Sequence, residues 1–376
     1  MERILTFGAS GDKLGGINSF LINMNKNMTE NCVFDYVIEG PNSVNHAQIE
    51  EAGGREYHTA YFRESPLKKI FQTYSFLKEC KQDHHVAYFN LFSMVHILEA
   101  LQAKHIGYKV VLHAHNNDIE NKSRLYRVLH NINRFLFRKV DCVRLTNSSL
   151  STEFMFGKEH NRDTIMIYNA IDPSMFQFND IIRSKKRKEL GIQDKLVVGF
   201  SGRLQLQKNP LFLIDVFDEI YKRKPEAILL IAGEGYLREK ILERIAEKKL
   251  DDRVFLLGNR SDMADLYQAM DLFLLPSKFE GLGIVLIEAQ CSGVPSVTSA
   301  DVVPAEAQVT NLLTYIPLSC SAKEWADLCL EKINMNSDRS VYSHIIEASH
   351  FNISKEAKRL EAILCGCGGS SIEQQR

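Results

Sequence analysis

Short apolar runs alternate with longer amphipathic stretches along this chain, and this alternation limits the possible folds more than any other feature of the sequence. It is typical of βαβ units, in which helices join the buried strands of a parallel sheet. We expect strands in the first half at residues 4–7, 34–38, 86–89, 110–113, 142–145 and 165–168. A second series is expected at residues 196–201, 228–232, 254–257, 272–275 and 295–297. The pattern predicts an α/β protein with two doubly wound, Rossmann-like parallel sheets in tandem.

Chain length agrees with two domains that face each other across a cleft. The 376 residues are long for one core but comfortable for two domains of roughly 150 to 200 residues. Residues 169–190 contain Pro173 and the basic run 183–188, which together indicate an exposed linker. We predict an N-terminal acceptor-binding domain at 1–175, a C-terminal donor-binding domain at 176–353, a helix at about 354–366 that packs back on the first domain, and a flexible tail at 367–376.

Composition places few limits on the partners. The net charge of -1 gives no bias toward nucleic acid, and the eight cysteines lack the spacing of zinc ligands. We assign no function to Cys365 and Cys367. The first ten residues predict a strand rather than a cleavable leader, and no segment approaches the roughly 18 apolar residues that span a bilayer. We expect a cytoplasmic protein, either free or peripheral on the inner face of the cell membrane.

Two cations follow the predicted strand at 196–201, at the strand end where parallel sheets bind ligands. Arg203 and Lys208 precede Asn209 and Pro210, a plausible N-cap and first helical residue. A guanidinium matches paired phosphate oxygens and an ammonium adds a compact charge, so this corner can hold a diphosphate without a metal. A solvated basic loop is the alternative explanation.

Two carboxylates follow the predicted strand at 272–275. Glu280 lies in the loop after the strand, and Glu288 lies about one and a half turns into the next helix. Gly281 and Gly283 allow the backbone to approach a ligand closely. Carboxylates accept hydrogen bonds from the paired hydroxyls of sugars and ribose. Complementing the helix dipole is an alternative role for Glu288, but it does not explain Glu280.

Taken in order, these stretches resemble the retaining GT-B glycosyltransferases of family 4, or glycosyltransferase group 1, and in particular the bacterial capsular and exopolysaccharide enzymes. The resemblance is strong over residues 196–297 and looser over the first 160 residues. The matching stretches are Gly15-Gly16-Ile17, His113-Ala-His115, Asn169-Ala-Ile-Asp172, Gly202-Arg203 with Lys208, Ala232-Gly-Glu-Gly235, and Pro276-Ser277 with Glu280 to Glu288.

The resemblance implies retaining hexosyl transfer from a nucleotide sugar, expected to be a UDP-sugar, to a glycan or lipid-linked acceptor in surface-polysaccharide synthesis. It implies no cofactor and no metal, the nucleotide sugar being the substrate. Arg203 and Lys208 would bind the diphosphate, Glu288 the ribose hydroxyls and Glu280 the transferred sugar. The implied donor-binding residues are Gly16, Arg203, Lys208, Gly258, Asn259, Glu280, Gly281, Leu282, Gly283 and Glu288. The residues implied in catalysis are Glu280, Arg203, Lys208 and His115.

Two histidines end the predicted strand at 110–113. His113 and His115 are two residues apart, so both can face one side of the strand. A metal site there lacks a third ligand. The resemblance favours contact of His115 with the sugar or acceptor, because it lies farther into the loop. Hydrogen bonding within the loop is the alternative.

Residues 121–140 alternate basic and apolar side chains and predict a basic amphipathic helix. One interpretation is docking to the anionic inner membrane near a lipid-linked acceptor. The other, which we favour from the sequence, is that the apolar side packs on the first sheet, because helices that flank a parallel sheet need an apolar face.

Other activities are compatible with parts of this pattern. A glycoside hydrolase also uses two carboxylates but has no need of Arg203 and Lys208. A dehydrogenase is disfavoured because Gly8 to Gly11 lacks the spacing of the dinucleotide fingerprint. A nucleotide-sugar epimerase of the same architecture and a non-catalytic sugar-nucleotide-binding subunit stay open.

Overall fold

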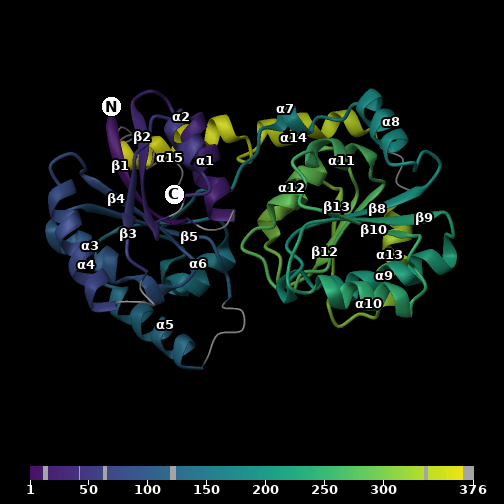
Figure 1. Cartoon of the computed structure of the whole chain (residues 1–376), viewed down its shortest axis with the longest axis horizontal. Helices are drawn as coiled ribbons and strands as arrows, with labels where there is room; N and C mark the ends of the chain where they lie inside the picture. Colours follow the sequence, from purple (N-terminus) through teal and green to yellow (C-terminus); the bar gives the residue numbers. More distant parts are fainter. Residues whose placement is uncertain (12–15, 42, 62–65, 119–123, 334–337, 367–376) are drawn as a thin grey trace. The chain divides into compact units, whose positions relative to one another are not determined.

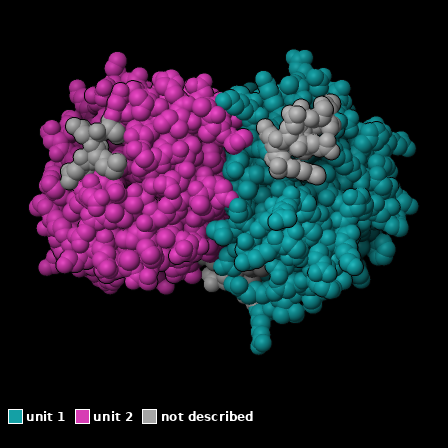
Figure 2. Space-filling model, turned by 180° about the vertical axis from the view of Figure 1, so that it is seen from behind, with its two compact units in different colours: residues 1–170, 353–376 teal, residues 171–352 magenta. Residues whose placement is uncertain are grey.

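The protein consists of two compact units, residues 1–170 with 353–376 (unit 1) and residues 171–352 (unit 2), shown in Figure 2. The computed structural model describes every residue except 12–15, 42, 62–65, 119–123, 334–337 and 367–376. The expected flexible tail, together with Gly15 and Cys367, lies outside the described residues.

Unit 1 contains a parallel sheet of seven strands in the order β3-β2-β1-β4-β5-β6-β7 (Figure 1). Its strands are β1 (Glu2–Ser10), β2 (Cys32–Glu39), β3 (Glu56–Thr59), β4 (Val86–Leu91), β5 (Lys109–Ala114), β6 (Val143–Thr146) and β7 (Thr164–Met166). Its helices are α1 (Gly16–Asn27), α2 (His46–Glu51), α3 (Pro66–Cys80), α4 (Leu98–Ile106), α5 (Arg124–Phe137), α6 (Ser149–Met155) and α15 (Ile353–Cys365).

Successive strand residues enter two different cores, as the twofold period of a strand requires. Ile4 and Tyr88 pack with α1 and α15 on one face of the sheet. Leu5 and Phe89 pack with α3, α4 and α6 on the other face. Because both faces are covered, the inner strands are continuous apolar runs, and this is why the sequence predicts them well.

Unit 2 contains a parallel sheet of six strands in the order β10-β9-β8-β11-β12-β13. Its strands are β8 (Leu196–Ser201), β9 (Ala227–Ala232), β10 (Val254–Gly258), β11 (Leu272–Leu275), β12 (Ser296–Ser299) and β13 (Leu313–Ile316). Its helices are α7 (Pro173–Phe176), α8 (Asp180–Glu189), α9 (Pro210–Arg223), α10 (Arg238–Glu247), α11 (Met263–Ala269), α12 (Ile284–Cys291), α13 (Ala322–Ile333) and α14 (Tyr342–Ala348). In Figure 1, α9, α10 and α13 cover one face, and α11, α12 and α14 the other.

The predicted α/β fold with two doubly wound sheets is confirmed, but two strands were missed. These are β3 and β13, which form edges of their sheets. β3 is merely half-buried and the two middle residues of β13 are half-buried, so neither shows the long apolar run of a central strand.

The predicted exposed linker at 169–190 is wrong, because its basic run lies in helix α8 and is packed into unit 2. Arg183 and Arg187 both bind the carboxylate of Asp271, at 2.5 and 2.9 Å. Lys186 binds Asp262 at 2.9 Å. The run is basic because acidic side chains around α11 pair with it.

The C-terminal helix α15 belongs to unit 1, where it packs on α1. Its Glu356 is 1% exposed and accepts a hydrogen bond from the backbone N–H of Tyr168 at 2.8 Å. Burial raises the pKa of this carboxyl to about 7. The bond ties the returning helix to the segment that follows β7.

We predict that Glu356 makes unit 1 less stable as the pH rises. The unfolded chain loses this proton near its ordinary pKa of about 4.3, so the stabilising contribution is complete below that value and is lost as the pH rises through about 7. Glu356→Gln keeps an oxygen for Tyr168 without ionising. The melting temperature of the variant minus that of the parent protein, measured by calorimetry, should be larger at about pH 8 than at about pH 5, by roughly 5 °C. An equal difference at both values would contradict the assignment.

Candidate active site

The predicted donor residues gather where the connections of the second sheet change direction. β8 and β11 are neighbours, although β9 and β10 lie between them along the chain, so this is the topological switch point at which such sheets bind ligands. Arg203 and Lys208 follow β8, and Glu280 follows β11. Sequence order alone does not reveal that these loops are adjacent.

Lys208 and Glu280 form a buried ion pair. The Lys208 ammonium donates to Oε1 of Glu280 at 2.6 Å, and the side chains are 12% and 6% exposed. Ser277 Oγ donates to the same oxygen at 2.6 Å. Ser277 lies three residues before Glu280, and this spacing is the sequence signal that could have identified its role. Both bonds end on Oε1, so the carboxylate is held in one orientation.

Gln207, which sequence reasoning missed, joins the two loops through backbone groups. Its carbonyl accepts from the backbone N–H of Lys278 at 2.7 Å, and its side-chain amide donates to the carbonyl of Phe279 at 3.2 Å. The backbone N–H of Glu280 donates to the carbonyl of Val302 at 3.1 Å. The ion pair is therefore supported by main-chain bonds that fix its position.

Arg203 differs from Lys208 because its side chain is exposed. It makes one long bond, 3.4 Å, to the Oε1 of Gln207. The loop after β9 needs glycine at position 233, where φ is +135°. A Cβ at Gly233 would lie 2.1 Å from the carbonyl oxygen of Gly202, the residue before Arg203. The loops after β8 and β9 thus pack backbone to backbone, and the guanidinium is left available for an anion.

Asn209 does not cap helix α9 as predicted. It adopts a left-handed conformation with φ +52°, and its side chain makes no capping bond. Pro210 does begin the helix, as expected. The short 3-10 turn at Leu206–Lys208 ends at Asn209, so the backbone reverses there instead of extending into the helix.

Glu288 lies on the first two turns of α12, after a left-handed Gly283. Tyr267 of α11 donates its hydroxyl hydrogen to Oε2 of Glu288 at 2.7 Å. Burial raises the pKa of Glu288, and the bond from Tyr267 and the charge of Lys208 oppose that rise. Burial, followed by the charge of Glu288, raises the pKa of Tyr267 far above its ordinary value, so the phenol stays protonated. Tyr267 was missed because nothing in the sequence links it to a residue 21 positions later.

The remaining residues that were predicted to bind the donor are distributed over three places. Gly281, Leu282 and Gly283 are buried between Glu280 and α12. Gly258 has φ +66° at the end of β10, and a Cβ there would lie 3.3 Å from the Glu234 carboxylate. Asn259, the next residue, is exposed. Gly16 lies in unit 1 as the exposed first residue of α1.

His113 and His115 do face the same side, with ring centroids 4.1 Å apart. Tyr88 OH bonds Nδ1 of His113 at 2.5 Å, and Asn90 Oδ1 bonds Nε2 of His115 at 2.8 Å. Burial lowers the pKa of His115 to about 3, so its ring is neutral at ordinary pH. A neutral imidazole can hydrogen-bond a hydroxyl, but it brings no positive charge to a phosphate.

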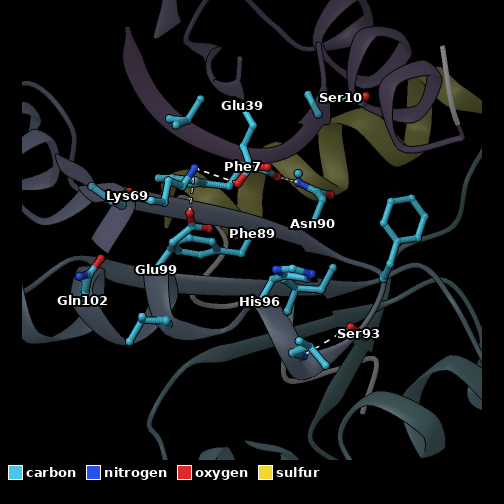
Figure 3. A pocket seen from close by; sticks show the side chains of 18 of the residues that line it. Phe7, Ser10, Glu39, Lys69, Phe89, Asn90, Ser93, His96, Glu99 and Gln102 are labelled. Atoms are coloured by element: carbon cyan, nitrogen blue, oxygen red, sulfur yellow. Dashed lines mark hydrogen bonds and ion pairs between the residues drawn. The ribbon is translucent and has the colours of Figure 1, made fainter. Parts of the chain in front are cut away.

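Unit 1 has a cavity of about 460 Å³ at its own switch point, between the ends of β1 and β4 (Figure 3). Apolar groups such as Phe7, Phe89 and Leu98 dominate its lining, and one cation lies among them. Lys69, 3% exposed, binds Glu39 at 2.9 Å and Glu99 at 3.2 Å. Sequence analysis did not predict this cluster, because its three charged members lie 30 residues apart on three different elements.

The described part of the chain shows neither a metal site nor a membrane-spanning helix. No group of three or more His, Cys, Asp or Glu side chains there is arranged to hold a metal ion. No described helix has the length and apolarity needed to cross a membrane.

Residues 182–344, which lie within unit 2, match the family Glycosyl transferases group 1. Over 340 residues, the chain is 27% identical to the "Putative glycosyltransferase EpsF" of Bacillus subtilis, covering 85% of this chain and 84% of that protein. A shorter stretch of 118 residues is 34% identical to the UDP-Gal:alpha-D-GlcNAc-diphosphoundecaprenol alpha-1,3-galactosyltransferase of Escherichia coli and covers 30% of either chain.

Solved structures share the fold. The complex of Anabaena HepE with UDP-glucose superposes with a TM-score of 0.79 at 20% identity, over 97% of this chain and 100% of that one. The glycosyltransferase WaaG of lipopolysaccharide biosynthesis gives a TM-score of 0.70 at 16% identity, over 96% and 100%. These likenesses establish the GT-B fold, with a Rossmann-like sheet in each unit.

We predict that Lys208 and Glu280 are coupled in stability. Lys208→Met leaves a buried carboxylate without its cation, whereas Glu280→Gln keeps an oxygen for the ammonium; the double variant has neither charge. The losses of unfolding free energy in the two single variants, added together, should exceed the loss in the double variant by about 1–3 kcal/mol. Urea unfolding followed through Trp325 measures this, because the chain has a single tryptophan and it is buried in unit 2. Losses that simply add would show that the pair is not coupled.

Proposed function

We propose that this chain, a glycosyltransferase of the group 1 family, is a retaining hexosyltransferase that passes a sugar from a UDP-sugar to a glycan or lipid-linked acceptor in surface-polysaccharide synthesis. The observation that carries the proposal is the set of charged groups at the switch point of unit 2: an exposed Arg203 beside Lys208, which Glu280 holds in place. The Anabaena neighbour supports the donor class because it binds UDP-glucose. The name of the Escherichia coli relative states a UDP-Gal donor and a diphosphoundecaprenol-linked acceptor.

Arg203 and Lys208 are assigned to the donor diphosphate. The Arg203 guanidinium can bind two phosphate oxygens at once, and the Lys208 ammonium supplies a second positive charge from the same loop. These charges stabilise the nucleoside diphosphate as it leaves, when its negative charge increases. The protein supplies this stabilisation itself, so we expect no requirement for a metal.

Glu288 and Glu280 are assigned to hydroxyl groups of the donor. Glu288, oriented by Tyr267, would accept hydrogen bonds from the ribose. Glu280 would bind the transferred sugar through Oε2, since Lys208 and Ser277 both occupy Oε1. The loop at Gly258 and Asn259 is assigned to the neighbourhood of the base. The two glutamates are groups that the fold already holds in one orientation.

We assign no protein nucleophile. The acceptor oxygen would attack the anomeric carbon on the face from which the diphosphate departs. The bond from that carbon to the phosphate oxygen breaks with its electron pair going to phosphate, and a phosphate oxygen takes the acceptor proton. Glu280 is unsuited to nucleophilic attack because Lys208 and Ser277 hold and neutralise it. Configuration is then retained without a covalent intermediate.

The cavity of unit 1 is assigned to part of the acceptor. It is largely apolar, with Lys69, Glu39 and Glu99 as its charged groups, which suits a sugar attached to an apolar chain. His115, neutral at ordinary pH, is assigned to a sugar or acceptor hydroxyl. Gly16 would allow the backbone of unit 1 to approach the ligand.

We predict that Arg203→Ala weakens binding of UDP about tenfold to a hundredfold, because a hydrogen bond between charged groups is lost. Calorimetric titration in the presence of a chelator measures this, and the melting temperature should not change. Lys224→Ala is the matched control, because Lys224 is exposed and precedes β9, at the opposite end of the strands. Equal weakening in both variants would refute the diphosphate assignment.

The transfer step is tested with Glu280→Gln. This variant keeps an acceptor for Lys208, so it should bind UDP nearly as well as the parent protein but transfer sugar much more slowly. Nuclear magnetic resonance of the product would show whether the anomeric configuration is retained. An inverted product would refute the retaining mechanism, and ring epimerisation of the donor without an acceptor would identify an epimerase instead.

We further predict that Tyr267→Phe changes the pH dependence of UDP binding. The bond from Tyr267 lowers the pKa of Glu288, so without it the raised pKa rises further. Binding that needs an ionised Glu288 is lost as the pH falls through that pKa, so the loss should begin at a higher pH in the variant than in the parent protein. Tyr108→Phe, which removes a buried hydroxyl in unit 1, is the control. If the loss of UDP binding at low pH were the same in Tyr267→Phe and the parent protein, the assignment of Glu288 to the ribose would be contradicted.

A further inference from the structure

Helix α5 is attached to unit 1 by its polar side. Tyr126 OH lies 2.9 Å from Oγ of Ser93. Nδ1 of His130 accepts from the backbone N–H of Met94 at 3.1 Å, and the side chain of Asn133 donates to the carbonyl of Met94 at 2.9 Å. These three residues recur at helical spacing and so lie on one side of α5.

The same side continues to the C-terminal end of the helix. Arg134 donates to the carbonyl oxygens of Glu153 and Phe154, both at 3.3 Å, and the His130 ring stacks on Phe154 at 4.4 Å. Phe137 is the only apolar side chain of α5 that is buried, at 3% exposure. Our expectation that the apolar side of this helix packs on the sheet is therefore wrong.

The opposite side of α5 is an exposed apolar stripe. Six large side chains contribute to it, and Leu125 is 76% exposed, while Phe135 and Leu136 are each 66% exposed. The stripe residues are Leu125, Val128, Leu129, Ile132, Phe135 and Leu136. Soluble surfaces rarely group large apolar side chains in this way unless something covers them.

Cations border the apolar stripe. Arg124, Arg127, Arg138 and Lys139 are exposed, and the sequence from residue 124 to 140 contains no acidic residue. The Arg138 guanidinium lies 5.0 Å from the centre of the Phe135 ring, and Arg127 is 3.4 Å from the Asp118 carboxylate. An apolar stripe with a cationic border matches the interface of an anionic bilayer, where acyl chains lie beneath negative headgroups.

We propose that the apolar stripe of α5 docks this protein on an anionic lipid bilayer. A second copy of the chain is a poorer occupant, because pairing two stripes would bring their cations together without acids on α5 to neutralise them. Helix α5 also contributes Leu129 and Asn133 to the lining of the unit 1 cavity. If the proposed function holds, a lipid-linked acceptor could reach this cavity while its lipid stays in the bilayer; docking itself does not depend on that function.

The test is co-flotation of the full chain with vesicles of phosphatidylcholine, with and without about one-third phosphatidylglycerol. The parent protein should float with the anionic vesicles. Phe135→Ser with Leu136→Ser should lower binding by about tenfold or more, because buried apolar area is lost. Arg124→Gln, Arg138→Gln and Lys139→Gln together should lower it by on the order of a hundredfold, at about fivefold per cation.

Controls separate docking from misfolding and from self-association. Ile181→Ser with Leu242→Ser removes two exposed apolar side chains of unit 2 and should leave flotation unchanged. UDP binding should be equal in all variants, so a failed docking test would not be confused with a failed donor site. Flotation that is absent, or equally strong in the stripe variant, would overturn the proposal. It would also be overturned by a parent protein that forms dimers which the stripe variant abolishes, without binding vesicles.

Discussion

Parallel strand pairing is the constraint on which the rest of this structure depends. In a parallel sheet all carboxyl ends lie along one edge, so the loops that follow the strands meet there whatever their distance along the chain. Gly202 to Lys208 and Pro276 to Glu280 become neighbours because β8 and β11 pair. The same rule in unit 1 brings the ends of β1 and β4 to a single cavity. Helices cover both faces of each sheet, which leaves this edge as the place for chemistry.

Charge at that edge is organised by pairing. Lys208 and Glu280 are both largely buried, and either one alone would be costly to remove from water. Together they keep a cation near the switch point and fix a carboxylate beside it. Glu288 is oriented differently, by a neutral phenol, so it keeps its capacity to accept hydrogen bonds. The two glutamates thus differ in environment although the sequence presents them as a similar pair, and this difference supports separate roles for them.

Helix α5 shows how far a periodic pattern can be interpreted. Its alternation predicts a helix with an apolar side and a polar side, and the helix is present at Arg124–Phe137. The pattern does not say which side meets the protein. Here the polar side does, because His130 and Asn133 form hydrogen bonds with backbone groups of Met94. The apolar side is left outward, where an ordinary flanking helix would be polar.

The sequence by itself determined the central strands, the edge strands β7 and β10, and the residues that follow the strands, including Arg203, Lys208 and Glu280. The strands and these residues follow from short-range rules, because a buried strand is a local apolar run and the candidate ligand-binding residues come directly after it in the sequence. Tertiary structure alone decided the two edge strands β3 and β13, the packed helix α8, the bond between Tyr267 and Glu288, and the burial of Lys69 between two carboxylates. These features join residues far apart in the chain, and which distant groups meet depends on how elements pack. No local periodicity carries that information.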